Sequence, residues 1–529
     1  MNKLPKILAS DRILDAVALP LLSVGQAVFL GIGVFATREA FGALHEGVQL
    51  QNTTLCKLAG SGILAVGLEF LRRICAERLG QSYASSLRVG LYRHLAGMQK
   101  SELDARRLGA LSLRFVGDLS AARNWFGWGL PRVVSAAIVL PGALLVFWLL
   151  DPGIALTSSV VLGLALLFMA AVAIGFERLH LRLRSRRARI AIAMMERISI
   201  APLLDLMGRT EQELKALEES GQQLREEATA RARRAGALSA IPQLGLTTAG
   251  ALALWQAAQS STAPGTVAAI LSMLGVLALP LRDLAMSWDQ YNGWRIAKGK
   301  ALRLFDKPSR LREQASAIGP VGVTVSGILG GKCVSLSVPA GSIGQLQGGN
   351  ARSRSILAML IAGLDTDADL KVDYGTGTAV LPRIHFIGDT PVALQGSLRR
   401  TLTLGISPRP AGKSIARIAR AFGLGELLPR GRKSLRGRVA EAARNLSTAD
   451  SLRIDLARIA LAKPDLVIID TSRFAADPEC EKLLKLLSDH VESTIVVVDR
   501  RGSDDQSFSF RANPTRPAAG QDLSSDQAF

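Results

Sequence analysis

Residues Asn445–Ser472, NLSTADSLRIDLARIALAKPDLVIIDTS, contain a polar start, an amphipathic helix and a buried strand in immediate succession. Apolar side chains recur at the spacing of one helical face: Leu452, Leu456 and Ile459. The apolar run Leu466–Ile469 is typical of a fully buried strand, and it ends on the carboxylate of Asp470. The next residue is Thr471, which carries no charge. This succession predicts an α/β domain in the second half of the chain.

The composition indicates a membrane protein with more than one domain. The chain has 529 residues, 48% of them hydrophobic, and a mean hydropathy of +0.25. This length exceeds that of one ordinary domain. The formal net charge of +20 does not indicate a nucleic-acid binder, because aromatic residues make up only 5% of the chain and much of the basic charge flanks apolar spans. We therefore expect a lipid bilayer as the partner and no nucleic acid.

The cysteines and histidines predict neither a disulfide framework nor a metal centre. The four cysteines are far apart in the sequence, at Cys56, Cys75, Cys333 and Cys480. The five histidines are equally scattered. The segment after Lys6 does not have the pattern of a cleavable signal peptide, since its apolar run is too long and further spans follow. We expect it to be retained as a membrane helix.

Six segments are long and apolar enough to cross about 30 Å of hydrocarbon, for which about 20 residues suffice. The predicted spans lie near Ala16–Thr37, Leu58–Cys75, Trp128–Leu150, Gly153–Phe176, Ala237–Ala258 and Thr266–Trp288. Prolines inside three of them are tolerated in a bundle, where neighbouring helices satisfy the freed carbonyl groups. The first half is therefore predicted to be a six-helix transmembrane bundle.

The loops between these spans predict the orientation. Glu77–Asn124 holds 8 lysines and arginines and Glu177–Arg234 holds 13, whereas Asp151–Pro152 and Gln259–Gly265 hold none. The positive-inside rule then places both long loops and both termini in the cytoplasm. Their helical patterns predict that residues 77–126 and 177–235 extend the membrane helices into the cytoplasm.

After Lys307 and Pro308 the sequence changes to short β-branched runs alternating with turns and amphipathic helices, which is typical of an α/β domain. The predicted strands are Val321–Val325, Ser342–Gln347, Ile384–Ile387, Leu466–Asp470 and Thr494–Val498. Arg501–Phe529 is polar and rich in Ser, Asp and Pro, so we expect a loose tail there.

The segment GQLQGGNARSRSILAMLIAGL, Gly344–Leu364, is a candidate phosphate-binding loop between a strand and a helix. Such a loop closes its backbone amides around phosphate oxygens, and a lysine supplies positive charge. Against the motif Gly-x-x-x-x-Gly-Lys-Ser/Thr, Gly348 matches the first glycine and Ser355 keeps the hydroxyl. Ser353 and Arg354 replace the last glycine and the lysine. Taken alone, the segment fails as this motif and favours a surface loop before an ordinary helix.

The order of the further motifs favours the phosphate-binding interpretation. HFIGDTPVALQGSL, His385–Leu398, resembles the Q-loop region of ABC ATPases, and Leu446–Ser447 stands at the position of their signature. Asp470 ends the following strand, and FAAD ends at Asp477. The membrane half agrees, because Ser85–Trp125 resembles the first intracellular segment of ABC exporters, and Pro280–Asp306 is similar to their sixth helix.

The chain is thus identified as similar to an ABC exporter half-subunit, over roughly residues 16–505. The resemblance implies a multi-domain fold: an all-α six-helix transmembrane bundle followed by an α/β P-loop NTPase-like ABC domain. The expected domains are a transmembrane domain over 1–306, a nucleotide-binding domain over 307–505 and a flexible tail over 506–529. It also implies coupling helices near Glu102–Gly109 and Asp205–Thr210.

The resemblance assigns nucleotide contacts and magnesium ligands to particular positions. The nucleotide contacts would be Gly348, Gly349, Asn350, Arg352, Ser353, Arg354, Ser355, Ile356, Ser447 and Asp470. Ser355 and Asp470 would be the magnesium ligands. The implied cofactor is Mg-ATP, bound weakly or not at all, because most motifs depart from the family pattern.

The departures affect each catalytic position. Thr471 replaces the general-base glutamate and cannot accept a proton from water at neutral pH. Asp499 stands at the switch-histidine position and Asp389 at the Q-loop glutamine. In the signature both glycines are lost, and Asp450 brings a negative charge that repels a triphosphate. Arg354 is a planar fork in place of a compact ammonium.

Structural roles remain open for two of the retained residues. Asp470 fits a strand-end or capping carboxylate as well as a magnesium ligand. Ser447 fits a helix N-cap as well as a signature serine, because an amphipathic helix follows it directly.

The resemblance implies a membrane subunit that pairs with an ATPase-competent half-transporter, or with itself, in the inner membrane. Autonomous ATP hydrolysis is not expected, since no catalytic residue is intact. The alternative is an ATP-independent scaffold or regulatory protein built on the same fold, and a decayed copy is a third possibility. The sequence does not indicate a cargo.

Overall fold

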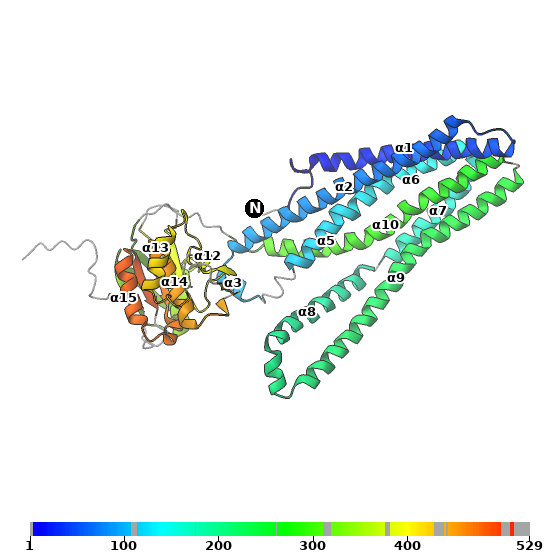
Figure 1. The fold of residues 1–529 in the computed structure, drawn as a ribbon. Coiled ribbons are helices and arrows are strands. Elements are labelled where there is room, and N and C mark those ends of the chain that lie inside the picture. The colour runs from blue at the N-terminus through cyan, green and yellow to red at the C-terminus, as the bar shows by residue number, and fades with distance from the viewer. Residues whose placement is uncertain are drawn as a thin grey trace, which may run out of the picture. The chain divides into compact units, whose positions relative to one another are not determined.

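The computed structural model describes residues 4–106, 114–174, 176–260, 262–309, 319–375, 381–427, 438–440, 443–498 and 508–512. The chain divides into two compact units. Unit 1 consists of residues 1–98 and 104–309, and unit 2 of residues 99–103 and 310–529. Figure 1 shows helices throughout unit 1 and a mixed α/β arrangement in unit 2.

Unit 1 consists of long helices with two π-helical turns. Its helices are α1 (Ile13–His45), α2 (Asn52–Ala96), α5 (Leu119–Asn124), α6 (Leu130–Leu150), α7 (Pro152–Ala173), α8 (Phe176–Leu206), α9 (Thr210–Gln259) and α10 (Pro264–Phe305). The π-helical turns are η1 (Arg114–Asp118) and η2 (Trp125–Gly129), which flank α5. Within the described residues, six helical segments are long and apolar enough to cross a membrane. The predicted six-helix bundle followed by an α/β domain is confirmed.

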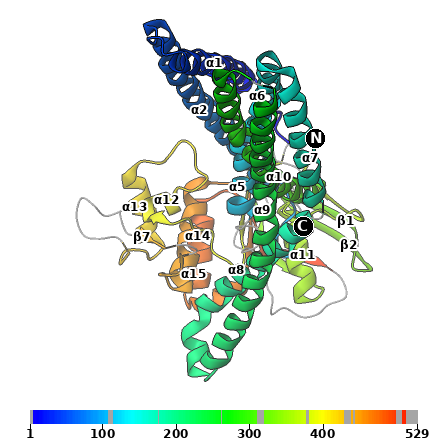
Figure 2. The ribbon, with the colours of Figure 1, turned by 90° about the vertical axis from the view of Figure 1, so that its right-hand side faces the viewer.

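Several spans continue far beyond the apolar segment that the sequence defines. The spans in α2, α9 and α10 belong to helices of 45, 50 and 42 residues. Helices α8 and α9 form a long hairpin, visible in Figures 1 and 2. Its turn is closed by a 2.7 Å hydrogen bond from the Thr210 hydroxyl to the Asp205 carboxylate.

Helix α2 approaches the backbone of η2 closely at Gly80. A Cβ atom on Gly80 would lie 2.7 Å from the Cα of Gly127 and 2.9 Å from the carbonyl oxygen of Arg123. These neighbours are backbone atoms, so no side-chain rotation can relieve the overlap. Two glycines therefore fix the distance between α2 and η2.

Unit 2 is built around two sheets. The five-stranded sheet has the order β10-β3-β9-β8-β5, and the three-stranded antiparallel sheet has the order β2-β1-β4. The strands are β1 (Val323–Leu329), β2 (Lys332–Val338), β3 (Ile343–Gln347), β4 (Leu370–Asp373), β5 (Ile384–Ile387), β8 (Leu466–Asp470), β9 (Thr494–Val498) and β10 (Ser509–Ala512). A short pair, β6 (Gly396–Ser397) and β7 (Arg438–Val439), completes them.

Strands β3, β9, β8 and β5 are parallel, and both faces of this sheet are buried. Val467 and Ile469 of β8 pack into one core with the helices, whereas Leu466 and Ile468 pack into the other core with the three-stranded sheet. The helices of unit 2 are α3 (Lys100–Asp104, up to Leu103), α11 (Ala351–Ile361), α12 (Leu398–Leu402), α13 (Gly412–Ala421), α14 (Thr448–Ala462), α15 (Cys480–His490) and the 3₁₀ turn η4 (Thr471–Ala476). Figure 2 shows α14 and α15 side by side.

The short segment Gln99–Leu103 belongs to unit 2 and contacts the residues that directly follow α11. The Lys100 amide donates to the Leu364 carbonyl at 3.0 Å. The amide and the hydroxyl of Ser101 both donate to Asp365, each at 3.0 Å. Residues 107–113, which hold the rest of the predicted coupling element up to Gly109, lie outside the described residues.

The predicted strands Ile384–Ile387, Leu466–Asp470 and Thr494–Val498 coincide with β5, β8 and β9. The first predicted strand starts and ends later than expected, as β1. The expectation of a flexible tail from residue 506 was wrong for Ser509–Ala512, because these residues pair antiparallel with β3. Phe508, just before this strand, joins the core, and Phe510 within the strand packs against it. A composition argument over the whole tail does not detect these two residues.

Gly80→Ala is expected to destabilise unit 1 by about 1–3 kcal/mol, because the added methyl group overlaps backbone atoms of η2. Thermal unfolding of the purified full-length protein measures the effect. Gly67→Ala is the matched control on the same helix, where nothing lies within 4 Å of the added atom. Equal melting temperatures for the two variants would contradict the close packing at Gly80.

Candidate nucleotide-binding site

The loop after β3 has the backbone shape of a phosphate-binding loop. Gly348 and Gly349 have φ angles of +88° and +62°, a region that side chains disfavour. Asn350 then caps α11, and its side-chain oxygen accepts a 2.7 Å hydrogen bond from the Ser353 amide. The strand, glycine turn and helix predicted from the sequence are therefore present. Arg352 is exposed, and Ser353 and Ile356 are partly buried in the first turns of α11.

Arg354 fills the inside of this loop with its own side chain. Only 1% of the residue is exposed. Its Nη1 donates to the carbonyl oxygens of Gly348 at 3.2 Å and of Gly349 at 2.6 Å. These are charge-assisted bonds in a buried place, so they hold the guanidinium firmly. The positive charge that the family directs at phosphate is here bonded to the loop backbone.

The outer side of the loop is covered by Phe508, which directly precedes β10. A Cβ atom on Gly349 would lie 2.5 Å from the Phe508 ring, and the ring itself is buried. The loop is therefore held from within by Arg354 and from outside by an aromatic ring.

The two candidate magnesium ligands are brought together. The Ser355 hydroxyl donates to the Asp470 carboxylate at 3.3 Å. The other oxygen of Asp470 accepts a 3.0 Å hydrogen bond from the Ser472 amide, and the residue is buried. Mg²⁺ prefers oxygen ligands, and a hydroxyl beside a carboxylate provides two of them. Asp470 also caps η4, so the structural role left open by the sequence is filled as well.

The residues fit magnesium better than they fit a nucleotide. Ser355 and Asp470 would hold a divalent cation, and the glycine loop would offer amides to phosphate. Arg354, however, already uses the loop carbonyls as acceptors and is buried. Binding of a triphosphate would require this side chain to leave its bonds, so the loop in its present shape does not fit Mg-ATP.

Of the remaining positions that the resemblance assigns to catalysis, the structure describes Thr471 and Asp389. Thr471 directly follows Asp470 at the start of η4 and is partly buried. Asp389 is exposed in the loop after β5. Asp499 follows the last residue of β9 and lies outside the described residues.

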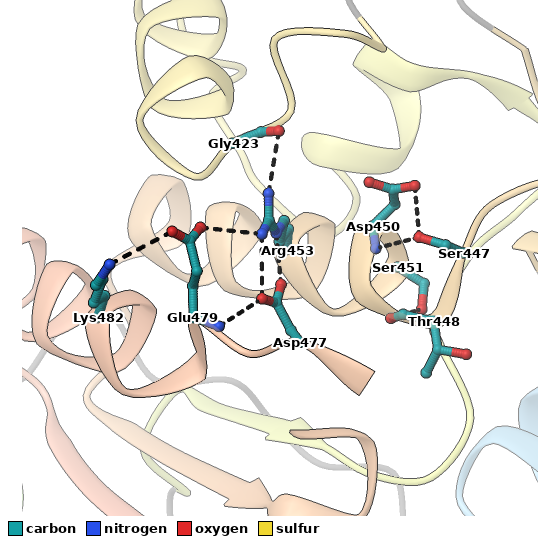
Figure 3. Close-up of polar contacts among 9 residues, drawn as sticks. All are labelled: Gly423, Ser447, Thr448, Asp450, Ser451, Arg453, Asp477, Glu479 and Lys482. Carbon is teal, nitrogen blue, oxygen red and sulfur yellow. Dashed lines mark hydrogen bonds and ion pairs between the residues drawn. The ribbon is translucent and has the colours of Figure 1, made fainter. Parts of the chain in front are cut away.

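At the signature position, Ser447 is the N-cap of α14, and its hydroxyl is hydrogen-bonded to Asp450 (Figure 3). The Ser447 Oγ accepts a 3.0 Å hydrogen bond from the Asp450 amide. The same hydroxyl donates to the Asp450 carboxylate at 2.7 Å. The carboxylate lies in the first turn of α14, where the helix dipole stabilises a negative charge. The N-terminus of α14 attracts an anion, and the Asp450 carboxylate of the same helix provides that negative charge.

The FAAD segment is anchored to α14 by an ion pair between Arg453 and Asp477, also drawn in Figure 3. Arg453 donates to the two carboxylate oxygens at 2.6 and 3.2 Å. Its hydrogen bonds hold the pKa of the buried Asp477 below the ordinary value. Glu479 extends the network by contacts with Arg453 and Lys482.

The sequence-based reasoning missed a buried ionic network beside this anchor. Asp455 accepts from Nη1 of Arg458 at 3.0 Å and from Nη1 of Arg473 at 2.7 Å. Arg458 also donates to the carbonyls of Thr401 and Val392, at 3.0 and 2.7 Å. Asp455 therefore ties α14 to η4, and Arg458 ties α14 to α12 and to the loop after β5. A lone acid in the apolar stretch LRIDLARIA, three residues before an arginine, was the available signal.

His385 of β5 lies near this network and stays neutral. Burial lowers its pKa to about 4, and the positive charges of Arg458 and Arg383 add to the effect. His385 lies on β5, the strand that leads to Asp389.

The geometry defines a class: a membrane-spanning helical unit fused to an α/β unit with a P-loop-type strand, turn and helix. The model of the ABC transporter transmembrane region matches residues 13–281, slightly more than half of the chain. The chain belongs to this family of ABC transporters.

Curated relatives cover most of the chain at low identity. An uncharacterized ABC transporter ATP-binding protein, YknV of Bacillus subtilis, is 20% identical over 488 residues, which are 87% of this chain and 80% of the relative. The multidrug efflux ATP-binding/permease protein Rv0194 of Mycobacterium tuberculosis is 25% identical over 88% of this chain, which spans only 40% of that protein. The ATP-dependent lipid A-core flippase of Pseudoalteromonas translucida is 21% identical, over 84% of this chain and 81% of the relative.

A solved structure of a bacterial Atm1-family ABC exporter with ATP bound has the same fold. The two superpose with a TM-score of 0.75 at 17% sequence identity, covering 93% of this chain and 91% of that chain. The fold is therefore that of an ABC exporter, with a transmembrane region fused to a nucleotide-binding-domain fold.

The neutral His385 makes stability depend on pH. Its pKa is lowered in the folded state to about 4, so its contribution is complete above the unfolded value of about 6.5 and is lost as the pH falls toward 4. We expect the melting temperature of the full-length protein to fall between pH 7.5 and 4.5. His385→Gln should flatten this slope, whereas the same change at the exposed His45 should not. Parallel slopes for both variants would contradict the assignment.

Proposed function

We propose that this chain is a membrane subunit of an ABC-type exporter with a degenerate nucleotide site. It pairs with an ATPase-competent half-transporter, and together they move a substrate across the inner (plasma) membrane, with the nucleotide-binding domain and the termini in the cytoplasm. The observation that carries the proposal is the buried guanidinium of Arg354, bonded to the carbonyls of Gly348 and Gly349. The domain limits are those expected from the sequence, apart from the folded strand β10.

Three features support the loss of autonomous hydrolysis. Arg354 competes with phosphate for the loop, and Thr471 offers no general base. Asp450 holds the Ser447 hydroxyl and adds negative charge at the signature. A homodimer would carry these losses in both of its sites, so two copies of this chain would not form a working ATPase.

Pairing with an intact half-transporter retains one useful site. In the head-to-tail arrangement that the resemblance implies, the partner's nucleotide would face the start of α14, where Ser447 is exposed. The partner would supply its own phosphate loop, base and magnesium ligands. Loss of a single electrostatic contact costs a factor of about 10²–10³ in rate, so such a site would turn over slowly.

The alternative function, an ATP-independent scaffold or regulator, is favoured by one specific observation. The phosphate loop and the signature serine are both saturated by the chain's own side chains, Arg354 and Asp450. A protein that never binds nucleotide would have this arrangement. Co-purification from the native membrane, followed by identification of the partner, separates the two: recovery of a half-transporter with intact motifs supports the subunit, and its absence supports the scaffold.

Arg354→Lys is expected to strengthen Mg-ATP binding about tenfold, the equivalent of about 1.4 kcal/mol. Both bonds to the loop carbonyls come from one nitrogen, Nη1. A lysine ammonium is more strongly hydrated and sits on a flexible stem, so it leaves these carbonyls for phosphate more readily than the guanidinium does. Binding of a fluorescent ATP analogue to the full-length protein is the measurement. Arg352→Lys, on the exposed side of the same helix, is the control and should leave the affinity unchanged. Unaltered affinity in Arg354→Lys would overturn the blocked-loop interpretation.

Asp450→Asn is expected to raise ATP turnover of the complex with its partner about fivefold to tenfold. The change removes one negative charge near the partner's triphosphate and releases the Ser447 hydroxyl from a carboxylate. The control Asp489→Asn removes an exposed charge from α15. If both variants have the same turnover as the unaltered complex, Ser447 does not face the partner's nucleotide.

A further inference from the structure

The antiparallel hairpin of α8 and α9 sets a register that brings arginines of the two helices to one level. Arg186 pairs with Glu227 at 3.0 Å, and Arg197 pairs with Glu213 at 2.7 Å. Continued toward the start of α8, this register places Arg178 level with Arg233 and Arg234. Arg182 follows one turn of helix below Arg178.

This level of the hairpin lies beside the membrane. Helix α7, a candidate span, ends at Ala173, and α8 begins at Phe176. On α10, Asp289 pairs with Arg231 of α9, and the neighbouring Trp288 and Tyr291 rings lie 5.8 Å apart. Trp and Tyr are enriched at the level of lipid head groups. The start of α8 and the Arg233 region of α9 are therefore at the bilayer surface.

The four arginines at this level are exposed, and in the described part of the chain they form no ion pair. They are Arg178, Arg182, Arg233 and Arg234. By contrast, Arg186, Arg197 and Arg231 of the same hairpin are each bonded to a carboxylate. Helix α9 has no acidic residue from Ala228 to its end at Gln259. The only acid among residues 176–195 is Glu177, whose side chain lies outside the described residues.

An exposed apolar surface adjoins the arginines on the membrane side. Ile174, four residues before Arg178, is 78% exposed, and Phe168 of α7 is 61% exposed. A layer of guanidinium groups next to an apolar wall matches a molecule with a phosphate at one end and acyl chains at the other. A soluble phosphate compound would leave the apolar part of this surface unused.

We propose that Arg178, Arg182, Arg233 and Arg234 form a binding surface for the head groups of anionic phospholipids in the adjacent leaflet. Guanidinium groups bind phosphate through paired hydrogen bonds. Each basic residue near an anionic membrane surface strengthens binding roughly fivefold at physiological salt. The inference goes beyond the proposed function, because binding of lipid at this surface requires no nucleotide.

The same helix offers a matched control. Arg187 and Arg189 are exposed, like the four arginines. At about 1.5 Å per residue, Arg178 lies about 3 Å along α8 from its first residue, Phe176, whereas Arg189 lies about 20 Å away. Screening reduces the field of a membrane surface within about 8 Å at physiological salt. Loss of Arg187 and Arg189 therefore changes the net charge equally and leaves the lipid contact intact.

The test uses the full-length protein in mixed micelles at 150 mM salt, with energy transfer from tryptophan to pyrene-labelled phosphatidylglycerol as the measurement. Arg178→Gln with Arg182→Gln should weaken binding roughly 25-fold, as should Arg233→Gln with Arg234→Gln. Arg187→Gln with Arg189→Gln should change it less than about twofold. Pyrene-labelled phosphatidylcholine should bind weakly and equally to all variants.

Several results would overturn the proposal. One is equal loss of phosphatidylglycerol binding in the Arg187 and Arg189 control, which would show a general charge effect. Another is displacement of the lipid by inorganic phosphate or ATP at constant ionic strength, which would show a soluble phosphate site. Where the glutamine variants do not fold, Arg178→Lys with Arg182→Lys keeps the charge. It must retain the preference for phosphatidylglycerol over phosphatidylcholine, and its loss contradicts the proposal.

Discussion

The parallel pairing of β3, β9, β8 and β5 is the constraint on which the candidate site depends. Leu346 pairs with Val498, and Val498 with Asp470, so the ends of three strands meet at one edge of the sheet. Because the sheet is buried on both faces, a shift in register would expose its apolar side chains. The glycine loop and the carboxylate of Asp470 are therefore held together by the fold, whether or not a nucleotide binds there.

Within this frame, the chain satisfies with its own side chains the groups that a nucleotide would use. Arg354 bonds to the loop carbonyls, and Asp450 holds the hydroxyl at the start of α14. Both charges are favourable where they lie. The positive charge of Arg354 faces carbonyl oxygens, and the negative charge of Asp450 lies at a helix N-terminus. The loop and the start of α14 are thus stabilised without a ligand by contacts within the chain, which is consistent with the proposed degenerate nucleotide site.

Much of the fold follows from local patterns, whereas the contacts of the site do not. The apolar runs of β5, β8 and β9 are bounded by turns and polar residues, so their limits could be predicted. Ser355 and Asp470 were predicted together because the family motifs place one at the end of the phosphate loop and the other at the end of a strand. The direction of the Arg354 side chain, the Phe508 ring on Gly349 and the pairing of Asp455 with Arg473 depend on tertiary contacts that spacing does not encode. The tail strand β10 was missed because the buried Phe508 and the partly buried Phe510 lie in a segment that is polar on average.

The buried charges argue against a merely decayed copy. A carboxylate in an apolar core costs several kcal/mol unless it is paired and hydrogen-bonded. Asp455 is paired with two arginines, and Arg458 also donates to two backbone carbonyls. Random loss of function would free such residues to change one at a time, and each single change would leave a buried charge uncompensated. The intact network instead keeps α14 joined to η4 and α12, so a force applied at the start of α14 reaches the strand edge that holds Asp470. This connection through the ionic network would serve a subunit that follows its partner's nucleotide cycle without hydrolysing ATP itself.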